Sequence, residues 1–115
     1  SWKHIEIIYE VYPLIQLVDN NPHKRVVYLP TYAEITVNST QLVLFHYAIR
    51  SWNNMARNSL MIHGHEHGGD YRSSPNNLDN GKIIDCGLEN FGKPISLKEL
   101  KLIMAKKEYK SIGHH

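Results

Sequence analysis

The stretch that decides the expected fold reads Leu60-Met61-Ile62-His63-Gly64-His65-Glu66-His67-Gly68. It begins with a short apolar run, which is typical of a buried strand and ends directly in glycine and histidines. The histidines are therefore expected at the C-terminal end of a strand. Residues two apart in an extended segment point to the same side, so His65 and His67 are expected to face one site. Gly64 and Gly68 permit tight turns around that site.

Further strands are expected on both sides of this stretch. Residues from Tyr32 to Val37 and from Gln41 to Phe45 are rich in β-forming side chains, and the polar turn Asn38-Ser39-Thr40 between them predicts a β-hairpin. A fourth strand is expected from Lys82 to Asp85. Residues from Gly68 to Asn80 have the composition of a long surface loop.

The end of the chain predicts an amphipathic helix. Ser96 is placed to cap it, with Glu99 reaching back three residues later. Its expected apolar stripe is Leu97, Leu100, Ile103 and Met104. Lys106 and Lys107 would follow in the last turn, where positive charge suits the helix dipole.

The N-terminal residues 1–31 form a segment of uncertain structure. From Ser1 to Asn21 the spacing of isoleucines suits a helix, while Pro13 and the β-branched residues argue against a continuous one. The following Asn20-Asn21-Pro22-His23-Lys24 is a polar break typical of a turn.

Composition describes an ordinary single globular domain. The 115 residues are 42% hydrophobic and 21% charged, and a net charge of +2 is too small to indicate a nucleic-acid surface. The one cysteine, Cys86, excludes an intrachain disulfide, and no apolar run is long enough to cross a bilayer. A cytoplasmic protein is expected. His114 and His115 are set aside as a tag remnant.

A third histidine completes a candidate metal site. His46 follows the expected strand that ends at Phe45, so it could join His65 and His67 in a cluster of three imidazoles, a common set of metal ligands. The pattern differs from that of helical zinc proteases, because Glu66 is followed at once by His67. The alternative is a non-catalytic metal-binding or interaction module, in which the histidine-rich loop alone holds a metal ion.

Other side chains near these strands have more ordinary expectations. Trp52 and Tyr47 are expected to pack against the core. Asp85, like Asp70, is expected to be solvated or to cap a turn, and Cys86 to be a small buried residue.

From about Tyr32 to Lys107 the chain resembles the later motifs of bacterial and phage calcineurin-like metallophosphoesterases. The resemblance is carried by Val43-Leu44-Phe45-His46-Tyr47 through Trp52, by the stretch from Leu60 to Gly68, by Ile84-Asp85-Cys86-Gly87-Leu88 and by Gly92-Lys93-Pro94-Ile95-Ser96 with the helix that follows. It implies an α/β (α+β) fold in which two packed β-sheets are flanked by helices. Residues 1–115 would form a single partial domain, the C-terminal half of that sandwich.

The resemblance also implies a function and its residues. A metallophosphoesterase hydrolyses phosphomonoesters or phosphodiesters at a two-metal site, where a bridging hydroxide attacks phosphorus. His46 and His65 would bind one metal and His67 the other, the metals being Mn, Fe, Zn or Ni. Nucleotides or nucleic-acid ends are plausible substrates by analogy with the family alone.

Three further residues belong to this expected site. Gly64 would let the loop approach the metals. His63 would either orient a ligand or substrate by a hydrogen bond or simply end the strand. Arg50 would either meet a substrate phosphate or be an ordinary exposed arginine.

The family's earlier motifs, Asp-x-His, Gly-Asp-x-x-Asp and Gly-Asn-His followed by Asp or Glu, are missing from the sequence. They supply the carboxylates, and three neutral imidazoles cannot hold two dications a few ångströms apart. His23 is a candidate catalytic residue at the position of the third motif, although its surroundings favour a turn residue. The chain is thus expected to be an excerpt of a longer protein, a half that pairs with a carboxylate-bearing partner, or a decayed copy.

Overall fold

The structure is a computed structural model that describes residues 4–11, 14–21, 25–64 and 81–107. The elements follow in the order β1 (Ile5–Val11), β2 (Leu14–Asp19), β3 (Val26–Tyr28), β4 (Tyr32–Val37), β5 (Thr40–Phe45), the 3-10 helix η1 (Met55–Arg57), β6 (Leu60–His63), β7 (Ile83–Asp85), α1 (Leu88–Phe91), β8 (Ile95–Ser96) and α2 (Leu97–Met104).

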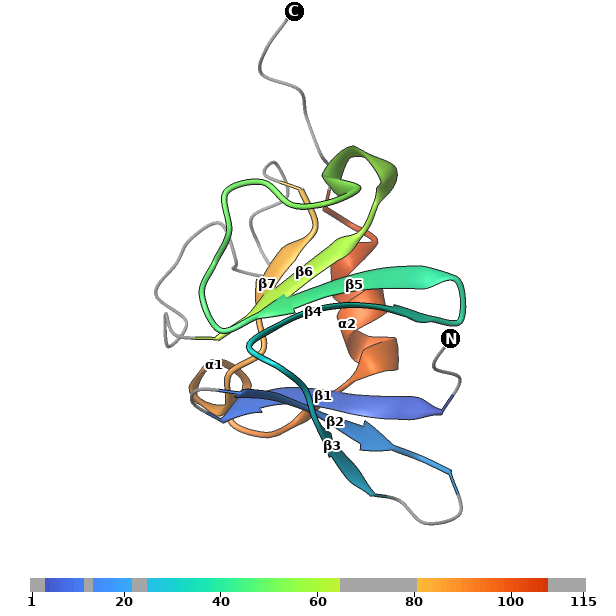
Figure 1. The fold of residues 1–115 in the computed structure, drawn as a ribbon, viewed down its shortest axis with the longest axis vertical. Helices are drawn as coiled ribbons and strands as arrows, with labels where there is room; N and C mark the ends of the chain where they lie inside the picture. The colour runs from blue at the N-terminus through green and yellow to red at the C-terminus, as the bar shows by residue number, and fades with distance from the viewer. Residues whose placement is uncertain (1–3, 12–13, 22–24, 65–80, 108–115) are drawn as a thin grey trace, which may run out of the picture.

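These elements form two four-stranded sheets, as Figure 1 shows. The first sheet has the order β3-β2-β1-β8, and its strand pairs are antiparallel. The second has the order β4-β5-β6-β7, in which β4 and β5 are antiparallel while β5, β6 and β7 run parallel. The described chain is therefore a small mixed α+β fold made mostly of strands. The expected pair of sheets is confirmed at this level, whereas the metallophosphoesterase fold itself stays a prediction.

The N-terminal segment, which the sequence pattern leaves unassigned, is largely strand where it is described. In β2 every second residue is buried, with Ile15, Leu17 and Asp19 inside. In β1 the buried residues Ile8 and Glu10 are likewise two apart. This period of two is the signature of a half-buried strand, and it decides against the helix.

The predicted hairpin from Tyr32 to Phe45 is confirmed, with a turn one residue shorter than expected. Thr40 is already in β5, opposite Val37. The two turn residues Asn38 and Ser39 both have positive φ, 47° and 68°. Two positive φ values are the mark of a type I′ turn, whose twist matches the strands that it joins.

The main hydrophobic core lies between the two sheets and includes the inward face of α2. It contains Ile8 and Leu17 from the first sheet, Leu44 and Ile62 from the second, and Leu100 from α2. In Figure 1 α2 lies behind β4 and β5. The predicted Ser96 cap is confirmed, since the Ser96 hydroxyl accepts a hydrogen bond from the Glu99 backbone N–H at 3.1 Å.

A second core covers the opposite face of the β4–β7 sheet. Val43, Met61 and Ile83 pack there under Trp52, whose Nε1 donates a hydrogen bond to the Ser59 carbonyl at 3.3 Å. The packing role of Trp52 is thus confirmed. The parallel strands are covered on both faces, which explains their continuous apolar sequences.

The lysine that contacts the C-terminal end of α2 is not one of the two that the sequence predicted. Lys82, which precedes β7, donates from Nζ to the carbonyls of Met104 and Lys107, at 2.6 and 2.7 Å. Lys107 is buried, and Lys106 is exposed in the turn after the helix. Lys82, distant in sequence, therefore adds a positive charge at the helix C-terminus to that of Lys101 in the last turn, and it donates to carbonyls there.

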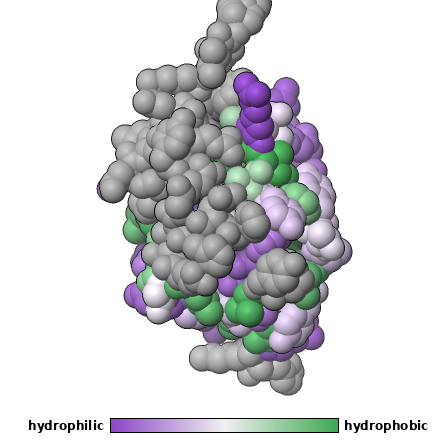
Figure 2. All heavy atoms as spheres, turned by 90° about the vertical axis from the view of Figure 1, so that its left-hand side faces the viewer, coloured by the Kyte–Doolittle hydropathy of each residue, from purple (hydrophilic) through white to green (hydrophobic). Residues whose placement is uncertain are grey.

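Two observations concern the exterior. Among the described residues, no helix is long and apolar enough to cross a membrane. Figure 2 views the molecule from the side of α1 and the ends of the parallel strands; the described residues visible there are a mixture of hydrophilic and hydrophobic groups rather than one continuous apolar area. The predicted surface loop from Gly68 to Asn80 lies outside the described residues.

Candidate functional site

The parallel strands β5, β6 and β7 bring three polar side chains to one edge of their sheet. His46 directly follows β5, His63 is the last residue of β6, and Asp85 is the last residue of β7. All three are buried, with exposures of 4%, 0% and 0%. The C-terminal edge of parallel strands is where open sheets commonly bind ligands, because loops diverge there.

The pleat divides these side chains between the two faces of the sheet. Leu44 and Ile62 point into the core between the sheets. Because side chains alternate along a strand, His46 and Gly64, two residues further on, share that face. His63 and Asp85, which are paired in register, lie on the opposite face.

Backbone hydrogen bonds hold the edge together. The N–H of Gly64 donates to the carbonyl of His46 at 2.9 Å, and the N–H of Cys86 donates to the carbonyl of His63 at 2.7 Å. Gly64 begins the Gly-His-x-His sequence. The structure thus brings the start of that motif directly beside His46, while the predicted cluster of His46 with His65 and His67 stays a prediction.

A carboxylate from the other sheet reaches His46. Glu10, near the end of β1, is 7% exposed, and its Oε2 pairs with Nδ1 of His46. A carboxylate is the natural acceptor for a ring N–H, so this pairing suits the tautomer with the proton on Nδ1. Because Nδ1 faces Glu10, Nε2 lies on the side of the ring away from that carboxylate.

Two glycines lie beside the buried carboxylates, and one of them leaves room for the Glu10 side chain. A Cβ on Gly64 would lie 2.6 Å from Cγ of Glu10, closer than real Cβ atoms approach. A Cβ on Gly87 would lie 3.0 Å from Oδ1 of Asp85 and 3.8 Å from Oε1 of Glu10. Gly64 is needed here for a close approach, and the carboxylates of Glu10 and Asp85 converge on Gly87.

His63 and Asp85 each bond to the neighbouring backbone. Nδ1 of His63 donates to the Gly64 carbonyl at 2.7 Å, and Oδ1 of Asp85 accepts from the Gly87 N–H at 2.8 Å. Asp85 caps a turn, as expected, but a solvated Asp85 is ruled out by its complete burial. Burial at the sheet edge follows from its position as the last residue of an inner parallel strand.

Cys86 is fully buried, which confirms the expectation for this residue. Burial raises the pKa of its thiol well above the usual value, and the negative charges of Asp85 and Glu10 raise it further. The thiol therefore stays protonated and is a poor nucleophile or metal ligand in the folded protein.

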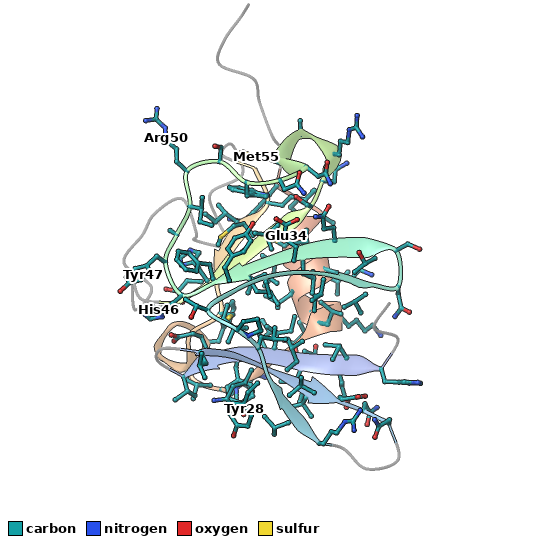
Figure 3. The ribbon with its side chains drawn as sticks, viewed as in Figure 1. Tyr28, Glu34, His46, Tyr47, Arg50 and Met55 are labelled. Atoms are coloured by element: carbon teal, nitrogen blue, oxygen red, sulfur yellow. The ribbon has the colours of Figure 1, made fainter. Side chains whose placement is uncertain are left out.

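The loop after His46 carries Tyr47 and Arg50. The Tyr47 ring packs edge-on against His46, with centroids 4.7 Å apart, and is 44% exposed, so it covers the imidazole rather than entering the core as predicted. Tyr47 lies two residues beyond the end of β5 and is therefore at the rim. Arg50 is exposed, and Figure 3 shows it projecting away from His46.

Several predicted residues lie outside the described part of the chain: His65 and His67 with Glu66, Asp70 and the candidate catalytic His23. Among the residues that the structure describes, no three His, Cys, Asp or Glu side chains are grouped closely enough to hold a metal ion. One observation fits a metal nonetheless: a carboxylate on Nδ1 is the usual partner of a metal-binding histidine.

Glu10 is the residue that sequence reasoning missed. A usable signal was present, because Glu10 falls two residues after the buried Ile8, on the inward face of the strand. A buried acid demands a partner. That partner could not be named, since the pairing of Glu10 with His46 joins two sheets across 36 positions of sequence.

Comparison with protein-family models, curated proteins and solved structures finds no match to this chain.

Proposed function

We propose that this chain carries the C-terminal half of a calcineurin-like metallophosphoesterase and contributes histidines to a two-metal site that hydrolyses phosphoesters. The observation that supports this best is the arrangement around His46. The imidazole is buried at a strand end, its Nδ1 is engaged by Glu10, and its backbone accepts a hydrogen bond from Gly64, the first residue of Gly-His-x-His.

In this proposal His46 and His65 bind one divalent metal ion and His67 binds the other. The metals, drawn from Mn, Fe, Zn or Ni, would supply activation of water and neutralisation of the phosphoryl charge. Glu10 keeps the His46 ring in place, and the glycine at position 64 lets the motif start close to that carboxylate. Tyr47 covers the ring from the exposed side.

The proposal requires carboxylates beyond those described near His46. Glu10 is committed to Nδ1 of His46, and Asp85 bonds to the Gly87 N–H. Two dications need anionic ligands between them, because neutral imidazoles do not offset their mutual repulsion. We therefore propose that Asp-x-His and Gly-Asp-x-x-Asp motifs are supplied from a preceding half of a longer protein or from a partner chain.

The first experiment is elemental analysis of metal per chain, on protein in which His114 and His115 are replaced by serine. Metal content and metal-dependent hydrolysis of p-nitrophenyl phosphate and of bis(p-nitrophenyl) phosphate are then measured on this chain alone and on the chain together with the preceding half or partner chain that supplies the carboxylates, and the outcomes below refer to the second preparation. Variants His46→Ala and His67→Ala are compared with His4→Ala, an exposed histidine just before β1 that serves as the matched control.

Two metals per chain and turnover that His67→Ala abolishes would support the enzyme. Turnover unchanged in His67→Ala would overturn the ligand assignment. One metal per chain without turnover, unchanged in His46→Ala, would instead support the non-catalytic module in which the histidine-rich loop alone binds the ion.

A further inference from the structure

We infer that Glu10 is a positioning residue for His46: it fixes the imidazole with Nδ1 protonated and turned toward β1, so that Nε2 is presented to a metal ion. This inference rests on the proposed function, because it takes His46 as a metal ligand. The inference goes beyond the proposed function because it assigns a role to a residue of the N-terminal segment, which the resemblance to the family does not cover.

The backbone of Glu10 is fixed independently of its side chain. Its N–H donates to the Cys86 carbonyl at 3.4 Å, and Glu10 forms a parallel β-bridge with Gly87. It also pairs with β2, opposite Ile15 and next to the last pair of that ladder. The carboxylate therefore approaches His46 from a strand that is held on both sides.

The space around the carboxylate is shaped to receive it. The Glu10 side chain is 8% exposed and the His46 side chain 4%, so water is largely excluded from the pair. Gly64 lacks the Cβ that would collide with the Glu10 side chain. A buried carboxylate is costly without a partner, so this packing favours the geometry in which Glu10 meets Nδ1.

The chemistry of the pair explains its effect on a metal. A carboxylate on Nδ1–H raises the basicity of the opposite nitrogen and restricts rotation of the ring, and losing such a partner lowers metal affinity about 10- to 100-fold. The amide oxygen of glutamine can still accept from Nδ1–H but carries no charge. Glu10→Gln should therefore keep the tautomer of His46 while lowering the affinity for the metal ion.

The test measures Zn²⁺ affinity by competition with a chromophoric chelator, on the full chain with His114 and His115 replaced by serine. The variants are Glu10→Ala, Glu10→Gln, His46→Ala and the double variant Glu10→Ala with His46→Ala. Glu6→Gln, an exposed acid on the same strand, is the matched control. A second readout is the ¹⁵N NMR signal of the His46 ring in metal-free protein, which distinguishes the two tautomers.

We expect Glu10→Ala to weaken Zn²⁺ binding about 10- to 100-fold and to mix the tautomers, Glu10→Gln to weaken it less with the tautomer kept, and Glu6→Gln to change neither. The double variant should bind no more weakly than His46→Ala. If His46→Ala weakens binding while Glu10→Ala matches the control, the positioning role is overturned and the ligand assignment survives. If His46→Ala has no effect, the ligand assignment in the proposed function is overturned as well. Should Glu10→Ala not fold, wild-type affinity in Glu10→Gln overturns the role.

Discussion

At the scale of single residues, the packing at the edge of the β4–β7 sheet depends on Gly64 having no side chain. Glu10 reaches His46 through space that any residue larger than glycine at position 64 would fill. The constraint is packing rather than backbone conformation, because Gly64 is not among the residues with positive φ. Gly64 thus has a structural reason to be glycine that does not depend on metal binding.

Gly64→Ala is expected to destabilise the fold by about 1–3 kcal/mol, the usual cost of forcing extra volume into a packed site. The new Cβ would collide with the buried Glu10 side chain, which has little freedom to move. Urea denaturation measures the effect. The control is the same substitution in a Glu10→Ala background, where the cost should shrink; an equal cost in both backgrounds would show that Glu10 is not the obstacle.

The raised pKa of the buried Cys86 thiol predicts that the folded protein loses stability at alkaline pH. Below the ordinary thiol pKa of 9.0 it is protonated in both folded and unfolded chains and adds no pH dependence. Above that pH the unfolded chain releases the proton, while the folded chain, whose thiol pKa is raised, keeps it. Unfolding is then favoured by up to about 1.4 kcal/mol for each further pH unit.

The measurement compares the free energy of unfolding at about pH 7 and about pH 10 for wild-type protein and Cys86→Ala. The cavity left by the smaller side chain lowers stability equally at both pH values. Wild-type protein should therefore lose more stability between them than the variant. Parallel losses would contradict a protonated, buried thiol.

At the scale of elements, features that depend on neighbouring residues could be predicted from the sequence, whereas features that depend on contacts between distant residues could not. The hairpin around Asn38 and Ser39 and the Ser96 cap of α2 depend on neighbouring residues, so the sequence predicts both. The C-terminus of α2 depends on Lys82, which lies 22 residues before Met104. Such a contact exists only after β7 and α2 have packed, and no sequence period indicates it.

Lys82→Met is expected to lower stability by about 1–2 kcal/mol, because it removes a charged donor from two carbonyls at the end of α2. Methionine retains most of the aliphatic length, so the change isolates the ammonium group. Thermal unfolding and amide exchange in α2 would report the loss. Lys106→Met, at an exposed position beside the same helix end, should change neither.

At the scale of the whole molecule, the two sheets explain why the N-terminal segment could not be placed from the sequence. Strand β1 carries β-branched residues at spacings that also suit a helix, and the choice is made by pairing with β2 and β8 and by burial against the second sheet. Those contacts are nonlocal. The same long-range packing creates the Glu10–His46 pair, so the candidate site and the N-terminal sheet arise together.

Removing residues 1–31 should therefore abolish cooperative folding rather than trim a dispensable arm. Among the described residues, sixteen are buried in the main core, and five of these come from this segment: Ile5, Ile8, Ile15, Leu17 and Leu29. Burial of each such side chain contributes about 1.5–3 kcal/mol, so losing all five is comparable to the entire net stability of a small domain, about 5–15 kcal/mol.

Circular dichroism and urea denaturation of residues 32–115, beside the full chain under the same conditions, measure the consequence. The full chain should unfold in one cooperative transition, and the truncated chain should show none and expose Leu44, Ile62 and Leu100 from the face that β1 and β2 had covered. Adding residues 1–31 as a separate peptide should restore the transition if the two sheets recognise each other. A truncated chain that unfolds cooperatively on its own would mean that the second sheet and α2 close their core without the first sheet, and that Glu10 reaches His46 as a later addition to a site already formed.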